Sequence, residues 1–416
     1  MDIKEYVIEK ASLAKTAARK MAIISTDTKN NALLAMADAL INNIDTIIEA
    51  NGIDMSIGKE KGLSISLLDR LMLDKKRIEA IAQGLRDVAF LDDPIGEALR
   101  MWKRPNNLKI AQVRVPLGVI GIIYEARPNV TVDAAALCIK SGNAVILRGG
   151  SEAINSNKTV AKIISEAGEK AGLPQGAISL IENTNRDAVN VMLKLNKYID
   201  VIIPRGGAGL INTVVQNSTV PVIETGVGNC HLYVDDSADL VRAIDITVNA
   251  KTQRPAVCNT IETLLVHKDV AEKFLPEVAK VLESLKVELR GCPVTQSIIT
   301  CKAATEEDYE TEFLDLILAV KVVDSLDDAI EHIYRYSSKH SESILTNNYA
   351  NSQRFLSEVD AAAVYVNAST RFTDGSEFGF GAEIGISTQK LHSRGPMGLK
   401  ELTSSKYIIY GEGQVR

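Results

Sequence analysis

The apolar positions in the first hundred residues recur at helical spacing. Between residues 3 and 21 they fall three or four positions apart, with Lys and Glu between them, which predicts an amphipathic helix. Similar stripes cover residues 33–47 and 78–85. Between residues 108 and 120 most positions are β-branched or aliphatic, and this composition favours strand. The chain therefore begins with helices and changes to strands just beyond residue 100.

Short apolar strands and helices then alternate as far as residue 228. The predicted strands are 143–148, 177–181, 200–204 and 221–224, and the predicted helices are 152–170, 186–195 and 210–216. This alternation is typical of a mostly parallel sheet covered on both faces, whose ligands lie beyond the carboxyl ends of the strands. Glycine-rich turns follow two of these strands, at 149–150 and 206–209.

The second half repeats the same pattern. We expect strands at 260–266, 317–323, 343–345 and 363–366, with a helix at 270–285. The tail ends in an apolar segment at 407–410 that reads as an exposed strand. The predicted fold class is therefore α/β, with two doubly wound parallel-sheet domains.

Composition narrows the possible functions. The 416 residues are 46% hydrophobic and 24% charged, which is ordinary for a globular protein. A net charge of −6 with 5% aromatic residues argues against nucleic-acid binding. No apolar run reaches the ~18 residues needed to span a bilayer, and no signal-type segment is expected. Five cysteines without a CxxC pair suggest neither a disulfide framework nor a zinc site, so we expect a reducing cytoplasm.

Cys258 is the cysteine in the most constrained position. Pro255 stops any preceding helix, and a strand is predicted to begin directly after the thiol. Arg254 lies nearby, and a cation lowers the pKa of a thiol and raises its thiolate fraction. A nucleophile is one interpretation, and a buried structural thiol is the other.

Two further features have open interpretations. Asn129 follows a predicted strand and the Pro128 break, so its amide is either a donor to a developing oxyanion or the cap of the next helix. Gly206 and Gly207 form one of two turns whose backbone N–H groups suit a pyrophosphate, although they also fit a plain tight turn. The full dinucleotide fingerprint G-x-G-x-x-G is absent from the sequence.

Several longer strings carry a family resemblance over almost the whole chain. Residues 115–119 (VPLGV), Asn129, 222–226 (VIETG), Cys258 and 312–313 (EF) resemble the aldehyde dehydrogenase superfamily. More narrowly, other strings are similar to the branch that reduces L-glutamate 5-phosphate in proline biosynthesis. They are 124–131 (YEARPNVT), 147–153 (LRGGSEA), 203–207 (IPRGG), 254–259 (RPAVCN), 366–372 (VNASTRF), 381–388 (GAEIGIST) and 392–399 (HSRGPMGL).

The resemblance implies an activity and a mechanism. An NADPH-dependent enzyme of this kind forms L-glutamate 5-semialdehyde and phosphate through a thioester on Cys258, with Asn129 as oxyanion donor. The implied cofactor-binding residues are Arg148, Ser151, Gly206, Gly207, Glu224 and Glu312. The implied substrate-binding residues are Arg127, Asn367, Ser369 and Arg371, for which loop-stabilising roles are an equal alternative. No metal is expected.

The resemblance also implies an aldehyde dehydrogenase-like organisation in three parts. We expect an NADPH-binding domain of residues 1–103 and 118–226, a catalytic domain of 227–390, and a small β-hairpin oligomerisation flap of 104–117 and 391–416. An apolar tail edge predicts a homo-oligomer, a dimer or a tetramer. A contact with a glutamate 5-kinase that supplies the acyl phosphate is a further possible partnership.

Two other functions remain open. A semialdehyde dehydrogenase that hydrolyses its thioester would share Cys258, Asn129 and Glu224 but would not need phosphate for aldehyde oxidation. A silent nucleotide-binding protein on the same fold is the second alternative, and intact Cys258, Asn129 and Glu312 argue against it.

Overall fold

The computed structural model describes residues 2–416, and the chain in it forms two compact units. The first unit holds residues 2–225, 379–385 and 397–416, and the second holds residues 226–378 and 386–396. None of the helices in the described part of the chain is long and apolar enough to cross a membrane.

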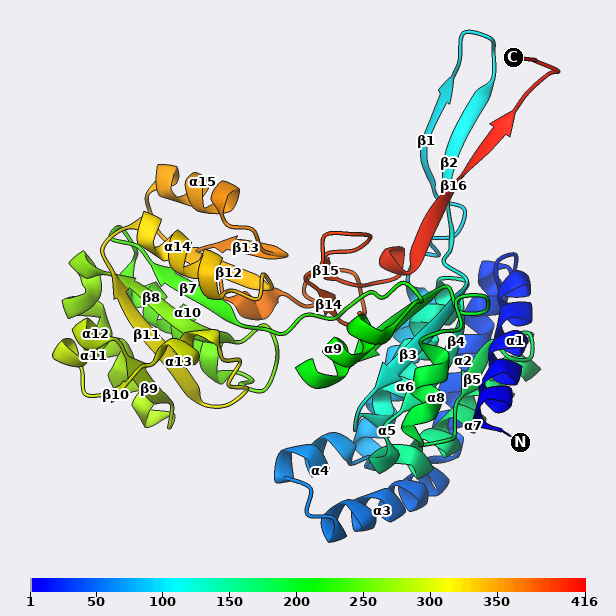
Figure 1. Cartoon of the computed structure of the whole chain (residues 1–416), viewed down its shortest axis with the longest axis horizontal. Coiled ribbons are helices and arrows are strands. Elements are labelled where there is room, and N and C mark those ends of the chain that lie inside the picture. Colours follow the sequence, from blue (N-terminus) through cyan, green and yellow to red (C-terminus); the bar gives the residue numbers. More distant parts are fainter. Residues whose placement is uncertain (1) are drawn as a thin grey trace. The chain divides into compact units, whose positions relative to one another are not determined.

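A four-stranded parallel sheet forms the centre of the first unit. Its strand order is β5-β4-β3-β6, and every neighbouring pair is parallel (Figure 1). The strands are β3 (Val119–Tyr124), β4 (Ala144–Gly149), β5 (Ile178–Leu180) and β6 (Val201–Arg205). Apart from Arg205 at the end of β6, all of these residues are buried, as the apolar runs in the sequence indicate for a sheet covered on both sides.

Helices cover both faces of this sheet. Ile120 and Ile122 pack into one cluster with residues of α2, α5, α6 and α7, whereas Val119 and Ile123 pack into another with residues of α1, α8 and α9. This alternation follows from the two-residue period of a strand. The helices are α1 (Ile3–Met21), α2 (Thr26–Asn42), α3 (Ile44–Glu60), α4 (Ile65–Leu71), α5 (Lys75–Phe90), α6 (Pro128–Lys140), α7 (Ile154–Lys170), α8 (Arg186–Met192) and α9 (Ala208–Asn217).

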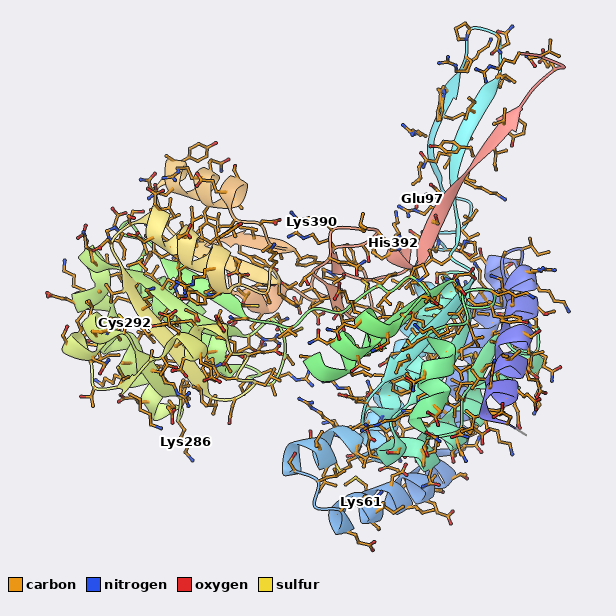
Figure 2. All side chains as sticks on the ribbon, in the orientation of Figure 1. Lys61, Glu97, Lys286, Cys292, Lys390 and His392 are labelled. Atoms are coloured by element: carbon orange, nitrogen blue, oxygen red, sulfur yellow. The ribbon has the colours of Figure 1, made fainter. Side chains whose placement is uncertain are left out.

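A three-stranded antiparallel ribbon extends from the first unit (Figure 1). It consists of β1 (Ala98–Lys103), β2 (Lys109–Pro116) and β16 (Thr403–Tyr410), with β2 in the middle. Glu97 lies at its base, where its carboxylate bonds the side chains of Arg114 and Lys400 at 2.7 and 2.9 Å (Figure 2). The expected pairing of the segment before residue 116 with the tail is confirmed. Strand β1 was missed because none of its residues is buried, so its sequence has no buried face to reveal.

The second unit contains a seven-stranded parallel sheet in the order β10-β9-β11-β8-β7-β12-β13. The strands are β7 (Cys230–Val234), β8 (Ile261–His267), β9 (Glu288–Gly291), β10 (Lys302–Ala303), β11 (Ile317–Val323), β12 (Ser341–Leu345) and β13 (Ala363–Val366). The helices are α10 (Leu240–Thr252), α11 (Lys268–Ser284), α12 (Pro293–Ile298), α13 (Glu306–Glu310), α14 (Leu326–Tyr336) and α15 (Tyr349–Glu358). A short antiparallel pair, β14 (Ile386–Ser387) and β15 (Gly395–Pro396), completes it.

Some expected boundaries differ from the observed ones. The strand predicted at 221–224 is reduced to a single bridge between Ile202 and Val222. The ribbon belongs to the first unit by its contacts, whereas residues 391–396 belong to the second. The sequence placed both segments in a separate flap. The functions assigned to the parts remain predictions.

Candidate active site

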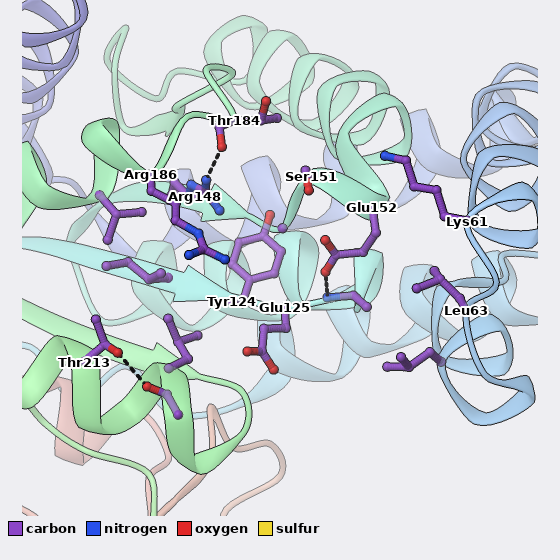
Figure 3. Close-up of a pocket in the computed structure, with 18 of the residues that line it drawn as sticks. Lys61, Leu63, Tyr124, Glu125, Arg148, Ser151, Glu152, Thr184, Arg186 and Thr213 are labelled. Carbon is purple, nitrogen blue, oxygen red and sulfur yellow. Dashed lines mark hydrogen bonds between the residues drawn. The ribbon is translucent and has the colours of Figure 1, made fainter.

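The first unit contains a cavity of about 750 Å³ beside the carboxyl ends of its strands (Figure 3). Residues 123–126 line it at the end of β3, Arg148 and residues 150–152 at the end of β4, and Gly209, Leu210 and Thr213 from α9 after β6. Lys61 and Leu63 close another side, from the segment between α3 and α4. This is the edge of a parallel sheet where nucleotides bind in open α/β folds.

Arg148 belongs to the cavity wall, but much of its guanidinium is already engaged. Nη1 donates to the carbonyl oxygen of Gly149 at 3.0 Å, and Nη2 donates to that of Thr184 at 2.7 Å (Figure 3). Nε is shielded from solvent and has no hydrogen-bond partner in the described residues. Burial lowers the pKa of Arg148. Arg148 therefore ties the loops after β4 and β5 together and places a positive charge at the wall.

Two carboxylates in the cavity bond to backbone N–H groups. Glu152 accepts from the N–H of Ala126 at 2.7 Å, and Glu125 accepts from that of Gly207 at 2.9 Å. A Cβ atom on Gly150 would lie 2.1 Å from the Glu152 carboxylate, so the turn needs glycine there. These bonds connect the loops that line the cavity.

The other cofactor-binding candidates of the first unit lie in different surroundings. Ser151 lines the cavity. Gly206 and Gly207 lie just before α9 and outside the lining, and a Cβ on Gly206 would come within 2.6 Å of Glu125. Glu224 is partly exposed and is likewise outside the lining. The structure therefore brings Arg148 and Ser151 to one cavity and leaves Glu224 apart from it.

Asn129 lies inside α6 and does not cap it. The helix begins at Pro128, a residue favoured at the first helical position, and the capping position is Arg127. Nδ2 of Asn129 donates to Oδ2 of Asp133 at 2.9 Å. Burial raises the pKa of Asp133 to about 6, against the opposing effect of this hydrogen bond. The cap interpretation of Asn129 is therefore wrong, and its amide is oriented by a neighbouring acid.

Cys258 lies on the turn that connects α10 to β8 in the second unit, and it is partly exposed. The side chain of Thr260 donates to the carbonyl oxygen of Arg254 at 2.7 Å and closes the turn. The thiol of buried Cys230 lies 3.2 Å from the carbonyl oxygen of Cys258. A Cβ on Gly228 would lie 1.7 Å from that same oxygen, so the chain at Gly228 passes directly against the cysteine backbone.

Glu312 helps to hold this close approach. Its Oε1 accepts the N–H of Gly228 at 2.7 Å, and burial raises its pKa. Glu312, the cofactor-binding candidate of the second unit, is therefore connected through one hydrogen bond to the backbone of Gly228, which contacts the backbone of Cys258.

The substrate-binding candidates of the second unit surround the same turn to different degrees. Nδ2 of Asn259 donates to the carbonyl oxygens of Arg371 and Thr373, and the Thr370 hydroxyl donates back to the carbonyl oxygen of Asn259. Nε of Arg371 donates to Gln253 at 3.0 Å. Burial, and next the charge of neighbouring Arg254, lowers the pKa of Arg371, whereas an ionised Cys258 opposes this effect.

Asn367 and Ser369 support the backbone. Both ends of the Asn367 amide bond the backbone of Thr346, at 2.9 and 2.8 Å, and its φ is +55°. Ser369 is buried and accepts the N–H of Arg371 at 3.3 Å. The contacts of Asn367 and Ser369 therefore fit the loop-stabilising alternative. Arg371 is the candidate whose guanidinium lies near the Cys258 thiol.

Sequence reasoning missed several residues that shape these places. Lys61 was missed because it is distant in sequence from the strand ends that line the cavity, and only the folded chain brings them together. Gly228 and Asp133 were missed because their roles depend on a distant backbone and on burial. The one available signal was the glycine pair Gly226-Val227-Gly228.

Comparisons with known proteins give a consistent result. The model of the "Aldehyde dehydrogenase family" matches residues 3–297. Gamma-glutamyl phosphate reductases of Clostridium novyi and Halothermothrix orenii are 76% and 62% identical, each over the whole of both chains. The crystal structure of gamma-glutamyl phosphate reductase from Thermotoga maritima is similar at a TM-score of 0.97, with 52% identity over 99% of each chain.

Proposed function

The chain belongs to the aldehyde dehydrogenase family, and on that premise we propose that it reduces L-glutamate 5-phosphate to L-glutamate 5-semialdehyde and phosphate with NADPH. It is an oxidoreductase of that family. The observation that carries the proposal is identity of 76% along the whole chain to a protein of that activity, together with a partly exposed cysteine on a constrained turn.

The cavity of the first unit fits a dinucleotide phosphate. It offers about 750 Å³ at the carboxyl ends of parallel strands, and the cations Lys61, Arg148 and Arg186 line it. Arg148 also holds a buried Nε without a partner in the described residues. We assign the cofactor to this cavity, with Arg148 and Ser151 on its wall and Gly206 and Gly207 leading into α9. A nicotinamide cofactor, when bound, supplies the hydride that converts the thioester to the aldehyde.

The chemistry of the acyl group belongs to Cys258. Its thiolate attacks the carbonyl carbon of the acyl phosphate, the S–C bond forms, and phosphate leaves with the bonding electrons of its oxygen. Covalent catalysis of this kind divides one difficult displacement into two easier ones. The close contact with Gly228 supports the scheme, because it fixes the backbone that carries the sulfur.

The remaining assignments are parts of the same proposal. Asn129 is the oxyanion donor, and its bond to Asp133 keeps the amide oriented. Glu312 and Glu224 act on the cofactor side. Arg371 binds an anionic group of the substrate and Arg127 another, whereas Asn367 and Ser369 keep the Arg371 segment in place. The homo-oligomer and the kinase contact remain predictions.

The test is the reverse reaction, NADP⁺ reduction with glutamate 5-semialdehyde. The wild type is expected to require inorganic phosphate, Cys258→Ala to lose the reaction, and Cys301→Ala to retain it. Full activity without phosphate would favour the hydrolysing alternative, and activity retained by Cys258→Ala would refute the mechanism.

A further inference from the structure

Two cations reach the nucleotide cavity from outside the sheet, Arg186 from α8 and Lys61 from the segment after α3. Lys61 follows α3 as its C-terminal cap, and in Figure 3 its side chain extends into the cavity toward Ser151 and Glu152. Figure 2 places it at the edge of the helical layer of the first unit. Within the described residues its amino group has neither an ion pair within 4.0 Å nor a hydrogen bond.

Three other charged groups of the wall are engaged, whereas Arg186 at the start of α8 has no ion pair within 4.0 Å and no hydrogen bond in the described residues. Arg148 donates to two carbonyl oxygens, and the carboxylates of Glu125 and Glu152 each accept a backbone N–H. The Ser151 hydroxyl lines the cavity near Lys61 and makes no hydrogen bond within the described part of the chain. One ammonium group and one hydroxyl therefore face the same space with their donors unused, which is an arrangement suited to an anion.

We propose that Lys61, together with the Ser151 hydroxyl, binds the 2′-phosphate of the adenosine half of the cofactor and so determines the preference for NADPH over NADH. The inference rests on the proposed function, since it adds selectivity to that cavity. A dinucleotide that lacks the 2′-phosphate offers Lys61 no anion at this position.

Glu152 explains why the cation is needed. A carboxylate in such a cavity suits the ribose hydroxyls of NADH and repels a phosphate. Glu152 is held in the cavity by its bond to Ala126, so its charge cannot turn away without breaking that bond. Lys61 offsets this charge in the wild type. Removing Lys61 leaves Glu152 opposite the phosphate and shifts the preference toward NADH.

The experiment measures binding and does not depend on turnover. Calorimetric titration with 2′,5′-ADP and with 5′-AMP compares wild type with Lys61→Ala. Loss of a charge-assisted contact is expected to weaken 2′,5′-ADP by about tenfold or more, and 5′-AMP by less than about twofold. The control is Lys59→Ala, which removes the same charge from the last turn of α3 outside the cavity. That variant is expected to bind both ligands as the wild type does.

Three outcomes would overturn the inference. They are unchanged affinity of Lys61→Ala for 2′,5′-ADP, an equal loss for both nucleotides, and the same loss in Lys59→Ala. A second measurement, the ratio of kcat/KM for NADPH to that for NADH, is expected to fall in Lys61→Ala by a similar factor. Because the titrations need no acyl phosphate, they decide the role of Lys61 even if the proposed reaction fails its own test.

Discussion

Replacing Gly228 by alanine tests whether the backbone beneath Cys258 sets the position of the nucleophile. The new methyl carbon would lie 1.7 Å from the carbonyl oxygen of Cys258 and 2.3 Å from its Cα. Ordinary contact begins near 3.4 Å, so the cysteine backbone must move by more than 1 Å. The backbone φ of Gly228 is not positive, so the expected effect of a methyl group comes from steric overlap and not from backbone strain.

The expected effect on catalysis is large. A displacement of 1 Å at a reacting group can cost about 10²-fold in rate. We therefore expect kcat of Gly228→Ala to fall by about 10² or more. Overpacking of this kind lowers the free energy of unfolding by about 1–3 kcal/mol, which leaves room for a folded variant. The cavity of the first unit does not involve Gly228, so NADPH affinity is expected to stay unchanged.

Three measurements separate these effects. Steady-state kinetics give kcat, cofactor fluorescence gives NADPH affinity, and the rate of iodoacetamide reaction reports on the Cys258 thiol. The control is Gly84→Ala in α5, where a Cβ meets nothing within 4 Å and activity is expected to be unaffected. Wild-type kcat in a folded Gly228→Ala enzyme would refute the reasoning, because it would show that the turn tolerates the shift.

Further predictions concern stability, pH and substrate binding. Lys251 and Glu262 form a fully buried ion pair at 2.5 Å, so Lys251→Met should lower the free energy of unfolding by about 3–5 kcal/mol in urea, and adding Glu262→Leu should recover most of it. Burial raises the pKa of Asp133 to about 6, so its ionisation disfavours the folded state. Ionisation of Asp133 should therefore lower the stability as pH rises from 3.8 through about 6, and in thermal unfolding scans Asp133→Asn should lose less stability than the wild type over this range. Arg371→Ala should raise KM for the acyl phosphate by about 10-fold or more, with NADPH affinity unchanged. A change confined to NADPH affinity would show that Arg371 was misassigned.

The architecture could be predicted because it follows from local patterns. Buried parallel strands read as short apolar runs, and their helices read as stripes, so the sheet of the first unit and four strands of the second were expected near their observed positions. Strands β7, β9 and β10 were missed. Strand β1 could not be found, because Ala98–Lys103 pairs with β2 through its backbone and none of its side chains is buried. The prediction of a strand at 221–224 was wrong for the opposite reason. It is apolar enough for a strand but pairs with β6 at one residue only.

A site residue could be suggested from the sequence only where its own side chain is reactive, as a cysteine thiol is. Local sequence placed Cys258 between Pro255 and a strand, and it does lie on a turn before β8. Its role as nucleophile came from the family resemblance and stays a prediction. Asn129 was assigned a cap as one alternative, but the helix begins at Pro128, two residues earlier than a cap at Asn129 requires. Lys61 reaches the cavity from a helix that is distant in sequence from the other lining residues, so no local sequence pattern could indicate its position there.

The most direct test is to identify the residue that carries the acyl group. The enzyme is incubated with glutamate 5-semialdehyde and NADP⁺ without phosphate, quenched in acid, and digested for peptide mass spectrometry. The account predicts a glutamyl group on the peptide that contains Cys258, which disappears when inorganic phosphate is added before the quench. An active enzyme that carries the acyl group on another residue, or never carries one, would contradict it.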